Sequence, residues 1–254
     1  MALFADGVVC TTDDLTDQDS GLLDVSKNSG INVTTKIRLA HEEIAGELHL
    51  WLDRTRPALD MVWATGLRIE QVVVTPVLRQ WEVMMALSLV YRDAYFSQLI
   101  DRYQAKWEEY SKLTRRAHER FIASGIGLVN NPVRQAAPPL LASVPGPQQG
   151  GTFYACVAWV NTEGREGAPS AASSMTVSDG HLMSVSAEDA PPQASGFNVY
   201  AGTDLTRMFR QNDTPIPAGI PFLYVPGAMV RGRLPGNGQD VESVRPLVRT
   251  LLRG

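Results

Sequence analysis

Hydrophobic residues in the first half of the chain recur every three or four positions, the spacing of one face of an α-helix. The spacing predicts an amphipathic helix over residues 34–54, with the apolar positions Ile37, Ala40, Ile44, Leu48 and Trp51. Pro57 follows and is expected to end this helix. One or two shorter helices are predicted before it, the second ending near Gly30, because glycine suits a helix C-terminus.

The strongest helical pattern begins at Thr75, a good N-cap, and Pro76, a good first helical residue. No glycine or proline follows until Gly125. An unbroken helix of this length would reach roughly 70 Å, more than a small core can cover. We therefore expect this helix either to pack against another subunit or to bend, with the bend between residues 97 and 104.

The second half of the chain carries short runs of strand-forming residues separated by glycine, proline and aspartate. The predicted strands are residues 152–160, 174–177, 182–186 and 196–201. Their rhythm is typical of a small antiparallel β-sandwich. The composition changes at the same place, since 14 of the 16 prolines lie from Pro132 onward and no lysine follows Lys112.

These patterns predict an α+β fold, with an N-terminal α-helical bundle that contains one long helix, a small antiparallel β-sandwich and an extended C-terminal tail. The predicted helical domain covers residues 1–129, and a proline-rich linker covers 130–150. The sandwich is placed at 151–230 and the tail at 231–254.

Charge and composition exclude several classes of protein. The formal net charge is −4, which argues against sequence-independent binding of nucleic acid or of an anionic membrane. No long apolar run or secretion signal is recognised, so we expect a soluble protein made in the cytoplasm. The two cysteines, Cys10 and Cys156, are expected to be free thiols.

No residue pattern points to catalysis, a metal or a cofactor. His41 and Glu42 begin like a zinc-protease helix, but Ala45 stands where the second histidine would be, and His49 lies off that face. We interpret both histidines as solvent-facing. The adjacent carboxylates at 13–14 and 42–43 point apart on a helix, and a basic group, Arg115, Arg116 and Arg120, is interpreted mainly as a solubilising feature. We expect no enzymatic activity, no metal and no cofactor.

Residues 73–76 (Val-Val-Thr-Pro), Trp81 and the segments 89–99 and 101–110 resemble head–tail connector (adaptor) proteins of tailed bacteriophages and prophages, over roughly residues 10–125. The resemblance implies a homo-oligomeric ring, usually of about twelve copies with a heterologous interface, below the portal protein. The ring would lie in the virion neck and bridge the portal to a tail or nozzle protein. Genome DNA would pass through its lumen without sequence-specific binding, and no membrane would be involved.

The second half resembles a fibronectin type III or immunoglobulin-like module in two segments, residues 154–164 and 196–200. The second segment resembles the module's third strand, which in the usual order precedes the strand that the first segment resembles. We therefore expect a permuted or atypical sandwich.

The resemblance implies three sets of site residues. The candidate subunit interface lies on the long helix and comprises Trp81, Tyr91, Tyr95, Trp107 and Tyr110. The candidate acidic lining of the lumen, which would repel phosphates, comprises Asp13, Asp14, Asp17 and Asp19. The candidate portal-docking residues are Arg245, Leu247, Arg249, Leu251, Leu252 and Arg253. The alternatives are a buried core, a solvated helix start and a frayed tail, respectively.

A different class of function is an oligomeric adhesion protein whose sandwich binds a host glycan or receptor. Sugars stack on exposed aromatic faces, and the aromatics available for this are Phe153, Tyr154, Trp159, Phe197, Tyr200, Phe209, Phe222 and Tyr224. The alternation along the predicted strands places most of these side chains in the core, which favours the connector. A scaffold with no virion role is a third, weaker interpretation.

Overall fold

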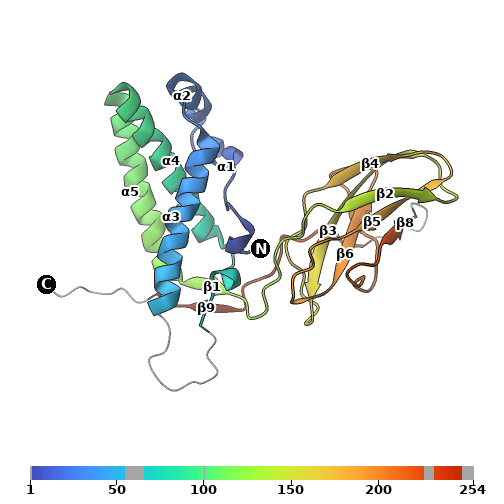
Figure 1. Cartoon of the computed structure of the whole chain (residues 1–254). Helices are drawn as coiled ribbons and strands as arrows, with labels where there is room; N and C mark the ends of the chain where they lie inside the picture. The colour runs from blue at the N-terminus through green and yellow to red at the C-terminus, as the bar shows by residue number, and fades with distance from the viewer. Residues whose placement is uncertain (1, 55–65, 100, 226–231, 248–254) are drawn as a thin grey trace, which may run out of the picture. The chain divides into compact units, whose positions relative to one another are not determined.

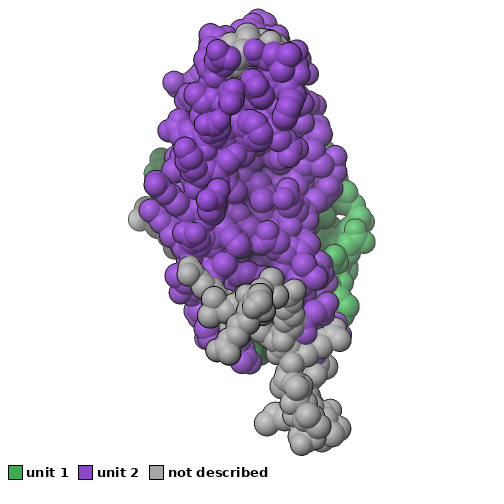
Figure 2. All heavy atoms as spheres, turned by 90° about the vertical axis from the view of Figure 1, so that its left-hand side faces the viewer, with its two compact units in different colours: residues 1–6, 129–241 green, residues 7–128, 242–254 purple. Residues whose placement is uncertain are grey.

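The computed structural model describes residues 2–54, 66–99, 101–225 and 232–247. The chain forms two compact units. A sandwich unit comprises residues 1–6 and 129–241, and a helical unit comprises 7–128 and 242–254 (Figure 2). The α-helices lie in the helical unit and the two larger antiparallel sheets in the sandwich unit, so the fold is α+β as predicted.

The helical unit follows its sequence signals closely. Its α-helices are α1 (Thr12–Gln18), α2 (Leu22–Ser29), α3 (Val33–Arg54), α4 (Pro76–Gln98) and α5 (Asp101–Ser124), with a short 3-10 helix η2 (Ile69–Gln71) before α4. Thr75 caps α4 through its hydroxyl, and Pro76 takes the first turn. α2 ends at Gly30, whose φ of 65° is readily adopted by glycine. The predicted helices before residue 55 are confirmed; Pro57 itself lies outside the described residues.

The single long helix predicted from residue 76 is wrong, and the predicted bend is confirmed. Leu99, at a left-handed φ of 53°, ends α4, and α5 begins at Asp101. The two helices run side by side as an antiparallel hairpin (Figure 1). Ring contacts show the pairing, since Tyr91 stacks on Tyr110 at 5.4 Å and Trp81 lies 5.3 Å from Phe121. Each helix therefore covers much of the other's apolar face within one chain.

The C-terminal segment returns to the helical unit. Strand β1 (Ile126–Leu128) follows α5 and pairs antiparallel with β9 (Ser243–Arg245). Gly125 allows this approach, because it has a φ of +80° and a Cβ there would lie 2.6 Å from the Arg245 carbonyl oxygen. The predicted extended tail is therefore wrong for these residues, which form a sheet.

The sandwich unit has two antiparallel sheets, one ordered β2-β5-β8 and the other β4-β3-β6-β7. Its strands are β2 (Leu140–Pro145), β3 (Gly151–Asn161), β4 (Ser173–Val177), β5 (His181–Ser186), β6 (Ala194–Gly202), β7 (Phe209–Arg210) and β8 (Phe222–Tyr224). The four predicted strands are β3 to β6. Their inward residues, including Trp159 and Phe197 in edge-on contact at 5.7 Å, form the core.

The predicted boundaries need two further corrections. Residues 140–145 form strand β2 rather than part of a linker, and β2 pairs with β5 along its whole length. The chain's first residues belong to the sandwich unit rather than the helical domain. Leu3 and Phe4, at the 3-10 helix η1 (Phe4–Asp6), are buried, and the Asp6 carboxylate accepts the Gln135 N–H at 2.8 Å.

Candidate interaction surfaces

Three of the five predicted interface aromatics belong to the core of the helical unit. Trp81 and Tyr91 are each 2% exposed, and Tyr110 is 5% exposed. The α4–α5 hairpin buries these side chains; for example, the ring centres of Trp81 on α4 and His118 on α5 lie 4.8 Å apart. The prediction of these three as subunit contacts is therefore wrong, because the hairpin supplies within one chain the cover that a straight helix would need from a neighbour.

Asp19 is also wrongly predicted, since it is buried rather than facing a lumen. Its carboxylate accepts hydrogen bonds from the Tyr91 hydroxyl at 2.7 Å, the Tyr110 hydroxyl at 2.9 Å and the Lys106 ammonium at 3.0 Å. The Gly21 N–H donates to it as well. Burial opposes the charge, but these donors outweigh burial and hold the pKa of Asp19 below its usual value. Asp19 therefore ties the α1–α2 junction to both helices of the hairpin.

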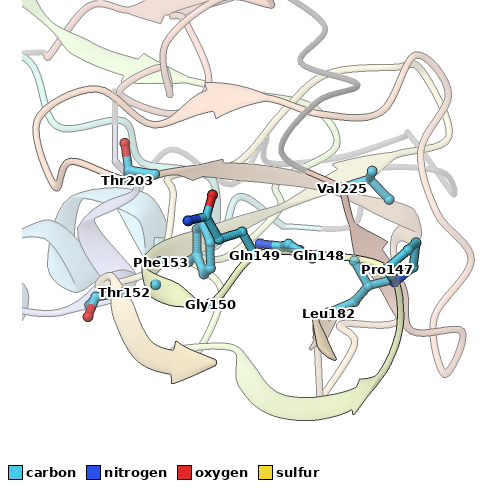
Figure 3. A pocket seen from close by; sticks show the side chains of 10 residues that line it. Pro147, Gln148, Gln149, Gly150, Thr152, Phe153, Leu182, Thr203 and Val225 are labelled. Atoms are coloured by element: carbon cyan, nitrogen blue, oxygen red, sulfur yellow. The ribbon is translucent and has the colours of Figure 1, made fainter. Parts of the chain in front are cut away.

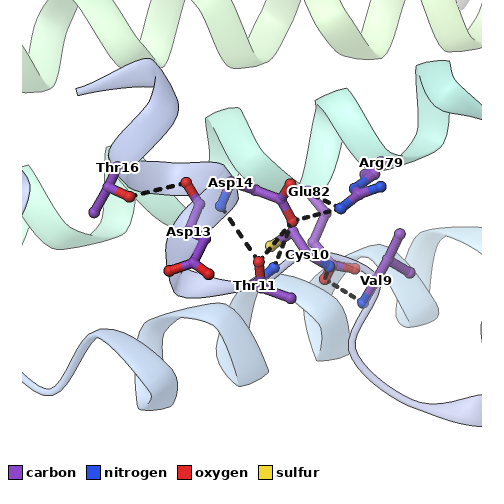
Figure 4. Close-up of polar contacts among 8 residues, drawn as sticks. All are labelled: Val9, Cys10, Thr11, Asp13, Asp14, Thr16, Arg79 and Glu82. Carbon is purple, nitrogen blue, oxygen red and sulfur yellow. Dashed lines mark hydrogen bonds and ion pairs between the residues drawn. The ribbon is translucent and has the colours of Figure 1, made fainter. Parts of the chain in front are cut away.

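The other three predicted lumen residues lie at the surface of α1. Asp14 closes a capping box with Thr11 and pairs with Arg79 of α4, whose Nη2 lies 2.7 and 2.8 Å from the two carboxylate oxygens (Figure 4). Burial alone would raise the pKa of Asp14, but Arg79 and Thr11 together lower it. Asp13 and Asp17 are exposed. Of the four predicted residues, these two are free to face a passing polyanion.

A second buried carboxylate, Glu82, was not predicted. One of its oxygens accepts the N–H groups of Val9 at 2.8 Å and Cys10 at 3.1 Å (Figure 4). The other lies 2.9 Å from Nδ1 of His41 on α3. The solvent-facing interpretation is therefore wrong for His41, although His49 is exposed. The sequence signal for this site is an acidic residue among the apolar residues 81–91 of α4.

Neither cysteine is arranged for nucleophilic chemistry. Both are free and buried, as expected for free thiols. Burial raises the pKa of the Cys10 thiol far above its ordinary value, and the neighbouring Glu82 carboxylate raises it further. Burial raises the pKa of Cys156 to about 11. Thiolates are the reactive form, so both positions act as small packed side chains.

The end of the α4–α5 hairpin carries an uncovered aromatic group. Tyr95 and Trp107 stack at 6.1 Å between ring centres, and Phe96 lies 5.6 Å from Trp107. Phe96 is 61% exposed and Leu99, at the turn, is 70% exposed. We call these four residues the hairpin-end patch. Tyr95 and Trp107 are the two predicted interface residues that remain half-buried at the surface.

The predicted docking residues are only partly within the described chain. Arg245 is exposed on β9, and Leu247 is half-buried just beyond it. Arg249, Leu251, Leu252 and Arg253 lie outside the described residues. The basic group Arg115, Arg116 and Arg120 is exposed on α5, as interpreted from the sequence.

The sandwich does not present its aromatics as a flat binding face. Phe153, Trp159, Phe197, Tyr200 and Tyr224 are buried, while Tyr154, Phe209 and Phe222 are half-buried. Tyr200 donates to Glu166 at 2.6 Å, and Glu166 also accepts from Asn198 and pairs with Arg233. Burial and the Glu166 carboxylate both raise the pKa of Tyr200. This network fixes the outer face of β6.

One end of the sandwich is hollowed. A pocket of about 660 Å³ lies beside the β2–β3 turn and the first residues of β3 (Figure 3). Its lining is Pro147, Gln148, Gln149, Gly150, Gly151, Thr152, Phe153, Leu182, Thr203 and Val225. None of these ten residues is charged.

Neither a metal-binding cluster nor a membrane-spanning helix is found among the described residues. There, no group of three or more histidine, cysteine, aspartate or glutamate side chains is placed to hold a metal ion. No helix in the same ranges is both long and apolar enough to cross a membrane. Comparison of the chain with protein-family models, curated proteins and solved structures finds no match.

Proposed function

We propose that this chain is a structural subunit of a homo-oligomeric ring, and that the ring is the head–tail connector of a tailed bacteriophage. The ring would sit below the portal in the virion neck and hold a tail or nozzle protein on its other side. Genome DNA would pass through the lumen. The chain would act by assembly, without catalysis.

The observation that carries this proposal is the hairpin-end patch. Phe96 and Leu99 expose most of their side chains beside the Tyr95–Trp107 stack. Contiguous apolar groups at a surface are typical of protein interaction sites, and aromatic side chains dominate the energy of many interfaces. The patch also lies within residues 89–110, the segment that resembles the connectors. We propose that it contacts the neighbouring subunit.

A closed ring needs two different faces on each subunit, because a heterologous interface joins one face to the other. The rigidity of the helical unit supports this geometry. Asp19 and Glu82 tie α1, α3, α4 and α5 into one body, so the patch is held at a fixed angle to the rest of the unit. Fixed angles are what allow a ring of defined copy number to close.

The proposal also assigns roles to two further groups of residues. Asp13 and Asp17 remain as acidic residues that can repel DNA phosphates in a lumen. Arg245, exposed on β9, stands at the start of the alternating arginine and leucine residues proposed to dock on the portal. Portal docking and DNA passage are separable steps and can be tested separately.

The assembly is tested by measuring particle mass by mass photometry, with and without the portal ring from the same phage. About twelve copies at 27.8 kDa each would add roughly 334 kDa to the portal. The double variant Phe96→Ser/Leu99→Ser should retain its helical content and lose this increment. Leu50→Ser, an equally exposed site on α3, is the matched control and should bind as the parent does.

Two outcomes count against the proposal. A parent chain that adds no mass to the portal would reject the connector role. Normal assembly by the Phe96/Leu99 variant would remove the hairpin-end patch from the subunit interface. For the lumen, Asp13→Asn/Asp17→Asn should slow genome delivery from assembled virions, and unchanged delivery would exclude that role for the two residues.

A further inference from the structure

The sandwich contains a polar group that the fold leaves without a partner. Neither the amide oxygen nor the amide nitrogen of the Gln148 side chain is exposed, and neither has a hydrogen-bond partner among the described residues. Buried amides in folded proteins are almost always paired, because an unpaired donor or acceptor loses its water without replacement. An exception of this kind requires an explanation.

The backbone beside Gln148 is, by contrast, firmly held. The Gln148 carbonyl accepts the Gly180 N–H at 2.8 Å, and the Gly150 N–H donates to the Asp179 carboxylate at 2.6 Å. The turn is therefore fixed to the turn that precedes β5, while no described residue holds the Gln148 amide by a hydrogen bond. Gln148 is one of the residues that line the pocket (Figure 3), and we expect rotation about its side-chain bonds to turn the amide toward a bound ligand.

The remaining lining indicates the chemistry that would fit. Gln149 and Thr203 add an amide and a hydroxyl, and Phe153, Leu182 and Val225 add apolar surface. The pocket is of the size that small ligands occupy, and a few polar groups in a largely apolar wall are typical of such sites. Since none of the described lining residues is charged, a charged ligand would be desolvated without a counter-charge from them.

We propose that this pocket is a binding site for a neutral saccharide unit. A sugar ring has a C–H face that packs on apolar side chains and hydroxyls that both donate and accept. Those hydroxyls match the Gln148 amide, which needs an acceptor and a donor at adjacent atoms. The pocket would bind by amide and hydroxyl contacts, since the sandwich aromatics are not exposed for stacking. The site lies in the sandwich unit and is independent of the connector assembly.

The test is an NMR titration of the ¹⁵N-labelled full chain with glucose, N-acetylglucosamine and glucuronate, followed by N-acetyl tri-alanine amide, a neutral peptide. We expect the two neutral sugars to shift the amide signals of Gly150, Gly151 and Thr203. Glucuronate should bind at least about tenfold more weakly than glucose, because it adds a charge to a similar ring. Shifts with the peptide alone would assign the pocket to a polypeptide and overturn the proposal, as would no shift with any probe.

The Gln148 amide is tested with a matched pair of variants. Gln148→Leu should weaken sugar binding by about tenfold or more, and it should raise the melting temperature of the sandwich because it removes the buried unpaired amide. Gln193→Leu changes an exposed glutamine of the same unit outside the pocket and should leave affinity unchanged. Equal binding by the parent and Gln148→Leu would overturn the role of Gln148. A lowered melting temperature would show that the amide is already paired in solution.

Discussion

The two units differ in how their most notable buried polar groups are paired. In the helical unit the buried carboxylates Asp19 and Glu82 are surrounded by donors drawn from several helices. In the sandwich unit the Gln148 amide and the Tyr224 hydroxyl are buried with no partner among the described residues. The two carboxylates of the helical unit are thus paired from several sides, whereas these two groups of the sandwich are not paired within the described residues.

For aromatic side chains the helical unit, and not the sandwich unit, is the one that leaves a group without cover. The sandwich unit buries or half-buries all nine of its aromatic side chains, Phe4 included, whereas the helical unit leaves Phe96 61% exposed at the hairpin end. An exposed apolar group can be buried against another protein surface, and an unpaired amide can form hydrogen bonds to a polar ligand. The difference between the units is the basis of the two proposals, a neighbouring subunit for the helical unit and a small neutral molecule for the sandwich unit.

The largest effect is expected from emptying the sandwich core. Phe197 is fully buried against Trp159, so Phe197→Ala should cost about 3–5 kcal/mol of the free energy of unfolding of that unit. Because each unit has its own core, calorimetry of the full chain should show one transition shifted and the helical transition in place. Leu205→Ala, at an exposed site of the same unit, is the control and should change stability by less than about 0.5 kcal/mol. Equal shifts of both transitions would show that the units unfold as one.

Removing Asp19 should have the next largest effect, in the other unit. Asp19→Ala leaves the buried hydroxyls of Tyr91 and Tyr110 without their acceptor and Lys106 without its counter-charge. The expected loss is about 3 kcal/mol, confined to the helical transition. Asp17→Ala, at an exposed position two residues earlier, should be nearly neutral in the same calorimetric measurement. Matching losses in the two variants would mean that the carboxylate network contributes little.

The local parts of the fold could be predicted because their signals are local. Thr75 and Pro76 set the start of α4, and Gly30 sets the end of α2. The bend at Leu99 could be placed only within a range, since leucine carries no turn signal and adopts a left-handed φ here because the two helices pack together. β2 was missed because it is an edge strand without a buried alternating face.

The polar sites could not be predicted because their partners lie far apart in the sequence. Asp19 receives donors 72 and 91 residues away, and an acidic helix end has the same local sequence whether it is solvated or buried. Glu82 had a signal, a charge inside an apolar helical face, but nothing in the sequence identified His41 as its neighbour. The hairpin-end patch was half predicted, since Tyr95 and Trp107 were recognised as interface candidates while Phe96 and Leu99 were not.

Acid should affect the helical unit through Asp19, with a smaller effect than the alanine substitution. Its pKa is lowered by folding, so its contribution to stability is fully present above the unfolded value of about 3.9 and is lost as pH falls through the lower folded value. A protonated carboxyl still accepts hydrogen bonds, which keeps this loss below that of Asp19→Ala. Thermal melts from pH 6 to pH 2 should therefore show a steeper decline at the acid end in the parent than in Asp19→Asn. Parallel curves would exclude Asp19 as a main source of acid sensitivity.

The smallest effect is expected at the surface pair Asp14–Arg79, which sharpens the contrast between exposed and buried charge within one unit. The Arg79 side chain is half exposed, and exposed ion pairs contribute roughly 0.2–1 kcal/mol even with good geometry. Arg79→Ala should cost no more than this, and the cost should shrink at high salt because solvent ions screen the pair. Arg92→Ala, at an exposed position of the same helix, is the control for helix propensity. Suppose instead that Arg79→Ala costs as much stability as Asp19→Ala at every salt concentration. Arg79 would then stabilise α1 by packing its aliphatic stem against the helix rather than by its charge. The contrast between strong buried and weak exposed charge pairs would not hold at this position.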